Sequence, residues 1–252
     1  WFTPSMIATL TPLCRDEIIP NWARTNLRHV FVGTAPLHSW IREDFRKRFG
    51  VNCLDSYGTT ECLFISVNPV DVINPDDATV GLLLPEVKIE VRNARGAIQL
   101  GNQEGDIWLN SPYTMTGYLD GLDSNLEVKS ENSNWLDTGD IGCIDNAGRL
   151  SITGRRKDLI IHGGINVSPK HVEDILLRYS GVQDAAVVGS PHPFWGEEVL
   201  AYVIPEGGGN LDADSLNIYC DEHLSTDARP SQIIFVNEFP RTSNGKIQKH
   251  LL

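Results

Sequence analysis

Four segments of this sequence combine side chains that could bind or activate a polar ligand. They offer an aromatic ring, hydroxyls, carboxylates and cations close together, often beside glycines that let a ligand approach the backbone. The segments are residues 55–61 (DSYGTTE), residues 135–140 (WLDTGD), residues 154–158 with 163–167 (GRRKD and GGINV), and residues 240–247 (PRTSNGKI). These residue types bind ligands by stacking, hydrogen bonding and ion pairing, so the four segments together form the candidate site.

Each segment taken alone also has a purely structural interpretation. The Thr-Thr-Glu of residues 55–61 is common at the start of a helix, where its side chains would cap the backbone. Residues 135–140 could be a solvated turn, and residues 240–247 could be an exposed tail. No single segment therefore establishes a function, and the argument depends on their order and spacing.

The first segment follows a predicted parallel βαβ unit. Residues 29–33 form a short apolar run that ends at a glycine and is typical of a buried strand. Apolar residues then recur at helical spacing between Pro36 and Gly50, and a second strand is predicted at residues 51–54. Ligands of such units bind at the carboxyl ends of the strands, which places residues 32–36 and 55–58 at a common edge.

The rest of the chain changes character twice. Between residues 81 and 150, alternating strands with Gly and Asn turns predict an antiparallel β region. After Lys157, a helix capped by Ser168 and ending near Gly181 precedes further predicted elements, namely strands at 185–188 and 199–204, a helix at 216–224 and a strand at 233–236. The fold class is therefore α/β followed by α+β, with domains at residues 1–156 and 157–252.

Composition narrows the classes of function. The chain has 252 residues with 33 acidic and 21 basic side chains and a net charge of −12, which disfavours binding to nucleic acid. No apolar run is long enough for a membrane span. Five scattered cysteines and the absence of a signal peptide favour a cytoplasmic protein. The chain begins at Trp1 without a methionine, so we expect a fragment or a processed product.

In this order and spacing, the four segments resemble the adenylate-forming superfamily. This superfamily includes acyl-CoA synthetases, aryl-CoA ligases, luciferases and the adenylation domains of peptide synthetases. The resemblance covers nearly the whole chain, including residues 105–118 and 189–197. It implies the second half of a large AMP-binding domain, followed by the complete small and mobile C-terminal domain.

The resemblance implies a nucleotide site in the large domain. Tyr57 would stack on adenine, Thr60 would donate a hydrogen bond to the α-phosphate, and Glu61 would hold Mg²⁺. Asp140 would accept both ribose hydroxyls, and Arg155 would reach the ribose or a phosphate. The remaining residues implied to border ATP or AMP are Gly33, Thr34, Ala35, Gly58 and Thr59.

The resemblance also implies roles for the small domain. Lys246 would bridge the α-phosphate and the attacking carboxylate, two anions that must approach each other. Lys157 would be the hinge about which the small domain turns between the adenylating and thioester-forming poses. Gly164 would line the tunnel for the pantetheine arm of coenzyme A.

Two features depart from the family pattern. The Ser/Thr/Gly-rich phosphate loop with its lysine, which lies upstream in the family, is absent from these residues, so we expect the isolated chain to be inactive. Ile161 stands where many members have a lysine that assists thioester formation. We therefore expect the missing N-terminal half, or a second copy in a homodimer, as a partner.

The hinge segment favours one subclass. Peptide-synthetase domains tend to read Gly-Arg-x-Asp-x-Gln-Val, whereas residues 154–160 read Gly-Arg-Arg-Lys-Asp-Leu-Ile. We expect a parent enzyme that activates a carboxylic acid with ATP and transfers it to CoA, as in fatty acid metabolism. The alternatives are transfer to the phosphopantetheine arm of a carrier protein, and a non-catalytic module that binds nucleotide or a partner.

Overall fold

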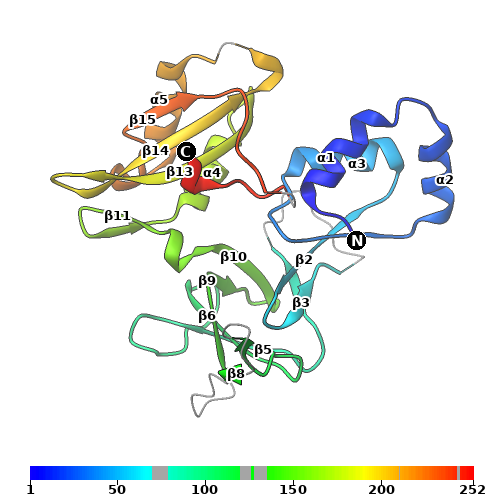
Figure 1. The fold of residues 1–252 in the computed structure, drawn as a ribbon, viewed down its shortest axis with the longest axis horizontal. Helices are drawn as coiled ribbons and strands as arrows, with labels where there is room; N and C mark the ends of the chain where they lie inside the picture. The colour runs from blue at the N-terminus through cyan, green and yellow to red at the C-terminus, as the bar shows by residue number, and fades with distance from the viewer. Residues whose placement is uncertain (70–78, 120–125, 128–134, 210, 243–244) are drawn as a thin grey trace. The chain divides into compact units, whose positions relative to one another are not determined.

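The computed structural model describes the chain except for residues 70–78, 120–125, 128–134, 210 and 243–244. It divides into two compact units, Trp1–Ile152 and Thr153–Leu252 (Figure 1). The predicted fold class is confirmed, because the first unit combines a parallel pair with antiparallel strands and the second is α+β. The predicted domain boundary at residues 156 and 157 stays a prediction.

The predicted βαβ unit is present at the start of the large sheet. Strand β1 (Val30–Val32) pairs in parallel with β2 (Cys53–Thr59), and helix α3 (Ser39–Phe49) connects them. Gly50 ends the helix in the left-handed conformation with φ 66°, as glycine readily does. Strand β2 runs five residues beyond the predicted end, so the interpretation of Thr-Thr-Glu as a helix start is wrong.

Two helices before β1 were not predicted. They are α1 (Pro4–Leu13) and α2 (Ile18–Asn26). Thr3 caps α1 by accepting a hydrogen bond from the Met6 amide at 3.2 Å, and Pro4 occupies the first helical turn, where its missing N–H costs nothing. This Thr-Pro pair was the available sequence signal for a helix start.

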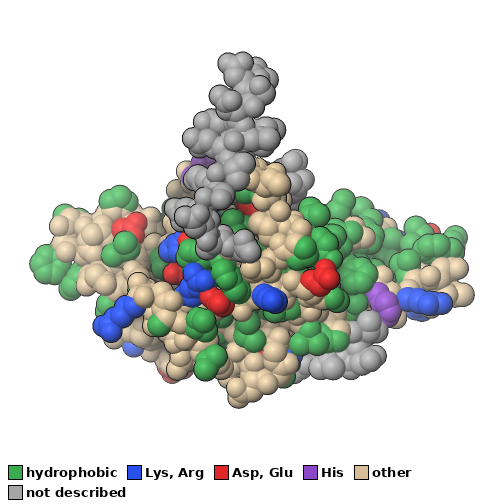
Figure 2. Space-filling model, turned by 90° about the horizontal axis from the view of Figure 1, so that it is seen from below, with side chains coloured by type: hydrophobic (Ala, Val, Ile, Leu, Met, Phe, Trp, Pro, Cys, Tyr) green, Lys and Arg blue, Asp and Glu red, His purple; other side chains and the backbone are tan. Residues whose placement is uncertain are grey.

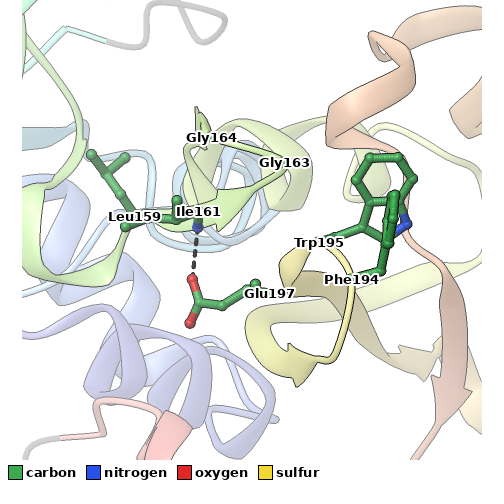
Figure 3. A pocket seen from close by; sticks show the side chains of 8 residues that line it. Leu159, Ile161, Gly163, Gly164, Phe194, Trp195 and Glu197 are labelled. Carbon is green, nitrogen blue, oxygen red and sulfur yellow. Dashed lines mark hydrogen bonds between the residues drawn. The ribbon is translucent and has the colours of Figure 1, made fainter.

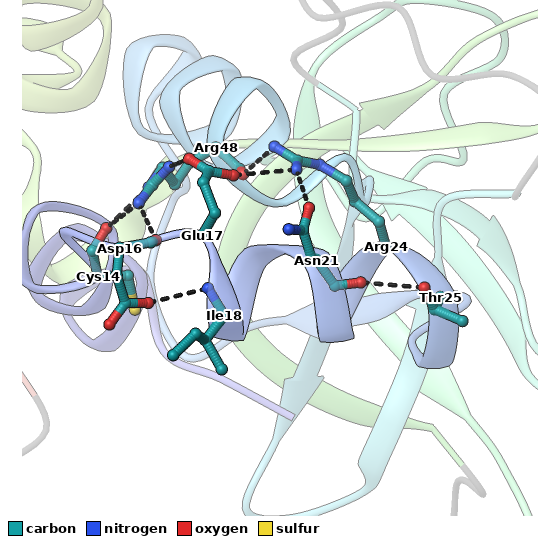
Figure 4. Close-up of polar contacts among 8 residues, drawn as sticks. All are labelled: Cys14, Asp16, Glu17, Ile18, Asn21, Arg24, Thr25 and Arg48. Atoms are coloured by element: carbon teal, nitrogen blue, oxygen red, sulfur yellow. Dashed lines mark hydrogen bonds and ion pairs between the residues drawn. The ribbon is translucent and has the colours of Figure 1, made fainter.

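Arg48 at the end of α3 ties down the connection between α1 and α2 (Figure 4). Its guanidinium donates to the carbonyl of Cys14 at 2.8 Å and forms an ion pair with Glu17. Arg24 reaches Glu17 from α2 at 3.2 Å. Hydrogen bonds from Arg48 and Arg24 hold the pKa of the Glu17 carboxyl below its usual range, so this exposed carboxylate stays ionised beside both arginines.

Large apolar side chains remain exposed on the first two helices. Ile18 is 76% exposed, and further exposed side chains on these helices are Met6, Leu13, Ile19 and Trp22. Apolar side chains also show on the right of Figure 2, the side on which α2 lies in Figure 1. Exposed apolar surface of this kind often marks an interaction site. The expected partner, an N-terminal half or a second copy, stays a prediction.

The antiparallel region completes one sheet with the βαβ unit. Its order is β1-β2-β3-β4-β10-β9-β6-β5. The added strands are β3 (Leu63–Val67), β4 (Gly81–Leu83), β5 (Lys88–Arg92), β6 (Gly105–Asn110), β9 (Leu136–Ile144) and β10 (Arg149–Arg155). Strands β7 (Tyr118–Leu119) and β8 (Leu126–Glu127) pair separately. A buried cluster under this sheet includes Cys62, Ile65, Ile107, Leu109 and Leu150.

Gly81 is the tightest backbone position of this sheet. It begins β4 at φ +90°, and a Cβ at this position would lie 2.0 Å from the Val67 carbonyl oxygen. We expect Gly81→Ala to destabilise the first unit by about 3 kcal/mol or more, because strain and a backbone clash add. Gly96 has a similar φ of +78° with nothing within 4 Å, so Gly96→Ala should cost only about 1–2 kcal/mol. Equal urea midpoints for the two variants would contradict this expectation.

The second unit is built around a separate five-stranded sheet. Its order is β12-β11-β14-β13, with β15 parallel to β14. The elements are β11 (Ile160–His162), β12 (Ile165–Val167), α4 (Pro169–Leu176), β13 (Val182–His192), β14 (Gly196–Pro205), α5 (Ala213–His223) and β15 (Gln232–Phe235). Short 3-10 turns lie at Arg156–Asp158, Glu206–Gly208, Thr226–Ala228 and Lys249–Leu251. The core includes Val172, Leu176, Val187, Ala201, Val203 and Leu216.

The turn Arg156–Asp158 separates the two sheets along the chain. It follows β10, which belongs to the first sheet, and precedes β11, which belongs to the second. Lys157 lies in this turn and is exposed. Its role as a hinge stays a prediction. Helix α4 begins as predicted, with Ser168 as its cap, but ends at Leu176 rather than near Gly181.

Candidate functional site

The hydroxyl of Tyr57 donates a hydrogen bond to the Asp140 carboxylate at 2.5 Å. Tyr57 lies on β2 and Asp140 on β9, 83 positions later in the chain, so only the tertiary fold brings them together. Asp140 is 3% exposed. A carboxylate this deeply buried requires polar partners, so the hydrogen bond to Tyr57 belongs to the folded interior and is not a solvated surface contact.

A sharp local turn in β9 fixes the position of Asp140. Gly139 adopts φ +70°, and its amide donates to the Asp137 carboxylate at 3.0 Å. The Asp140 amide donates to the Thr138 hydroxyl at 3.1 Å, and that hydroxyl donates to the Ile107 carbonyl at 2.8 Å. Residues 135–140, interpreted alone as a solvated turn, therefore lie largely within a strand that is tied to β6.

Residues Gly33, Thr34 and Ala35 follow β1 and lie beside β2. Gly33 is buried, and a Cβ at this position would lie 2.7 Å from the Trp1 ring and 3.0 Å from the Ser56 hydroxyl. Thr34 has φ 79°, a left-handed conformation that is costly for a residue with a branched side chain. The structure thus brings the predicted segment against the strand that carries Tyr57, as expected for carboxyl ends of parallel neighbours.

The end of β2 and the turn after it present the remaining residues of the first motif. Gly58 packs so closely that a Cβ would lie 2.1 Å from the Leu63 carbonyl oxygen. Thr60 and Glu61 lie in the turn to β3, and the Met115 amide donates to the Glu61 carbonyl at 2.7 Å. Thr59 has a buried hydroxyl oxygen without a hydrogen-bond partner among the described residues. A buried hydroxyl without a partner is costly, so this oxygen can gain from a further hydrogen bond.

A buried ion pair connects helix α3 to strand β2, close to the first motif. Arg42 on α3 is 6% exposed, forms an ion pair with Asp55, and donates to the Cys53 carbonyl at 3.0 Å. Burial raises the pKa of the Cys53 thiol to about 12, so this thiol stays protonated at neutral pH. Cys53 is therefore a packing residue and not a nucleophile.

The loop with Lys246 is a closed turn. Thr242 donates its amide to the Lys246 carbonyl at 2.8 Å, and the Lys246 amide donates to the Thr242 hydroxyl at 3.2 Å. Arg241 pairs with Ile247 in an antiparallel bridge and forms an ion pair with Asp184 on β13. The exposed Lys246 side chain thus stands on a braced loop, which disfavours the interpretation as a loose tail.

Gly164 lines an open pocket of about 770 Å³ in the second unit (Figure 3). Its φ of +86° requires glycine, and nothing lies within 4 Å of an added Cβ. The other lining residues are Leu159, Ile161, Gly163, Phe194, Trp195, Gly196 and Glu197. The carboxylate of Glu197 accepts the Ile161 amide at 2.6 Å and so connects β11 to the hairpin of β13 and β14.

The predicted site residues thus fall into two groups. In the first unit, a hydrogen bond joins Tyr57 to Asp140, and Gly33 lies beside Ser56, the neighbour of Tyr57 on β2. Thr34 and Ala35 follow Gly33 in the chain, Gly58 and Thr59 end β2, and Thr60 and Glu61 lie in the adjoining turn. Arg155, Gly164 and Lys246 belong to the second unit, so their contribution to a nucleotide site stays a prediction. Phe194 and Trp195 were missed as pocket residues. Two adjacent aromatics before a glycine, between two apolar runs, were the available signal for an exposed hairpin tip.

Comparison with known families identifies the superfamily to which the chain belongs. The model of the AMP-binding enzyme family matches residues 1–119, and the model of the AMP-binding enzyme C-terminal domain matches residues 171–246. The chain belongs to the adenylate-forming superfamily. Within this superfamily it is of the acyl-CoA synthetase type, because the similar curated proteins are acyl-CoA ligases.

Three relatives of this adenylate-forming chain illustrate the match. A putative acyl-CoA ligase, YdaB, of Bacillus subtilis is 34% identical over 81% of this chain and 40% of its own length. A long-chain-fatty-acid–CoA ligase of Salmonella typhimurium is 34% identical over 87% of this chain and 39% of its own length. The match to the crystal structure of ATP-bound MatB from Rhodopseudomonas palustris covers 99% of this chain and 49% of the MatB chain. The sequence identity is 30% and the TM-score is 0.86.

The chain spans 40% and 39% of the length of these two curated relatives. No helix among the described residues is long and apolar enough to cross a membrane. The same residues contain no group of three or more His, Cys, Asp and Glu side chains placed to hold a metal ion. Mg²⁺ in nucleotide sites does not need such a group, because it commonly binds one or two carboxylates together with substrate phosphates.

Proposed function

We propose that the protein containing this adenylate-forming chain activates a carboxylic acid with ATP and transfers the acyl group to coenzyme A. A carboxylate oxygen attacks the α-phosphorus and pyrophosphate leaves. The CoA sulfur then attacks the acyl carbonyl, and AMP leaves with the electron pair of the broken bond. The observation that carries the proposal is the hydrogen bond between Tyr57 and the buried Asp140, because it joins the two motifs expected to hold adenine and ribose.

In the first step, the residues around Tyr57 hold the nucleotide. The Tyr57 ring offers a flat face for adenine, and Asp140 accepts the ribose hydroxyls. Thr60 donates to the α-phosphate, and the Thr59 hydroxyl gains a partner when the site fills. Glu61 would hold Mg²⁺ together with the nucleotide phosphates, and the ion would offset phosphate charge during attack.

In the second step, the pocket beside Gly164 receives the thiol arm. The pocket is open and is lined by apolar side chains, by three glycines and by Glu197. A glycine with φ +86° and open space around it lets a thin, uncharged chain run against the backbone. Arg155, exposed at the end of β10, contributes a cation for the ribose or a phosphate.

The proposal is tested on the full-length protein with a panel of carboxylic acids. ATP–pyrophosphate exchange reports the first step, and thioester formation with CoA or with a pantetheinylated carrier protein reports the second. We expect exchange with at least one acid and thioester formation with CoA. If exchange occurs but the acyl group is transferred only to the carrier protein, the acceptor is the carrier protein and not CoA. If the protein binds nucleotide without catalysing exchange, it is a non-catalytic binding module.

A further inference from the structure

The wall of the pocket beside Gly164 is formed by two aromatic side chains that are not held by burial. Phe194 is 77% exposed and Trp195 is 45% exposed, at the tip of the hairpin between β13 and β14 (Figure 3). Their rings contact each other edge to face, with centroids 4.6 Å apart. Exposed aromatic rings stay in place only if the backbone beneath them is fixed.

A single imidazole nitrogen fixes that backbone. The amide of Phe194 donates to Nδ1 of His192 at 3.2 Å, and the amide of Trp195 donates to the same nitrogen at 3.1 Å. A nitrogen that accepts two N–H groups must present its lone pair to them. The turn therefore depends on Nδ1 of His192 as an acceptor.

His162, which lies beside the same hairpin tip, acts as a hydrogen-bond donor. Nδ1 of His162 lies 2.8 Å from the Glu197 carbonyl oxygen, which can only accept, so this nitrogen carries a proton. The His162 ring stacks on Trp195 at 5.3 Å, and the Gly163 amide donates to the Trp195 carbonyl at 2.8 Å. His162 therefore acts as a donor beside this turn, whereas His192 acts as an acceptor.

We infer that His192 is a positioning residue for the thiol-binding pocket, acting through the lone pair of Nδ1 on the amides of Phe194 and Trp195. This inference rests on the proposed use of the pocket by coenzyme A. Without the acceptor, the two amides lose their partner and the aromatic wall becomes mobile. The consequence is weaker CoA binding with no effect on adenylation, which uses other residues.

Three substitutions in the full-length protein test this role. In His192→Asn, the amide oxygen can take the place of Nδ1 and does not titrate. In His192→Gln, the polar group moves to the place of Nε2, and His192→Ala has no acceptor. We expect a KM for CoA about tenfold higher in the Ala and Gln variants, as for loss of two ordinary hydrogen bonds, and close to wild type in the Asn variant. ATP–pyrophosphate exchange should be unchanged in all three.

A further readout separates this role from general damage to the fold. Amide hydrogen exchange at Phe194 and Trp195 should accelerate in the Ala and Gln variants but not in the Asn variant. Unchanged amide exchange in His192→Ala overturns the structural part of the inference, and faster exchange with an unchanged KM overturns the role in CoA binding. Failure of the proposed function would appear separately, as absence of CoA thioester in the wild type.

Discussion

Replacing Lys246 with alanine in the full-length protein is expected to slow acyl-AMP formation about a hundredfold or more, with little change in ATP affinity. In the proposed reaction, the lysine cation would offset the repulsion between the substrate carboxylate and the α-phosphate, a contact made mainly in the transition state. The structure supports such a role, because Lys246 projects from a turn braced by Thr242 and by the ion pair of Arg241 with Asp184. The measurement is single-turnover formation of acyl-AMP.

Thioester formation from pre-made acyl-AMP should survive in Lys246→Ala, because that step uses the pocket beside Gly164 instead of the lysine. Lys170→Ala is a matched control, since it removes another cation of the same unit that only pairs with Asp174 along α4. It should change neither step. Equal losses in both steps for Lys246→Ala would exclude the two-pose mechanism, and no loss in either would show that Lys246 has no catalytic role.

Replacing Asp140 with asparagine should raise the dissociation constant for ATP about a hundredfold, again in the full-length protein. The carboxylate is expected to accept two ribose hydroxyls, and hydrogen bonds to a charged group typically contribute about 1.5–3 kcal/mol each. Asparagine keeps the shape and can still accept from Tyr57, so the fold should be retained. Isothermal titration with ATP measures the effect, and thermal unfolding checks the fold.

Asp137→Asn is the matched control for this substitution. Asp137 lies on the same strand and accepts the Gly139 amide at 3.0 Å, which an asparagine oxygen can also do. We expect ATP affinity close to wild type for this variant. If both variants bind ATP equally well, Asp140 serves the packing of β9 and does not recognise the ribose.

Local pattern was sufficient for much of the fold. The βαβ unit, the end of α3 at Gly50 and the start of α4 at Ser168 follow from short-range signals: apolar spacing, a glycine in the left-handed region and a capped Pro turn. The family was also evident from four motifs in order. Helices α1 and α2 were missed, although Thr3 and Pro4 carried a start signal for α1. Several of their large apolar side chains remain exposed, so these helices lack the usual separation of a buried apolar face from a polar one.

The sequence by itself determined the family, the βαβ unit and the identity of the site motifs, because those depend on residues near one another in the chain. Only the tertiary structure decided that Tyr57 and Thr59 lie within a strand, that Asp140 is buried against Tyr57, and that His192 holds the backbone of Phe194 and Trp195. Strand length depends on pairing with neighbours. Burial of a carboxylate and the partner of an imidazole nitrogen depend on segments that are distant in the chain or on the exact shape of a turn, which residue type and spacing do not fix.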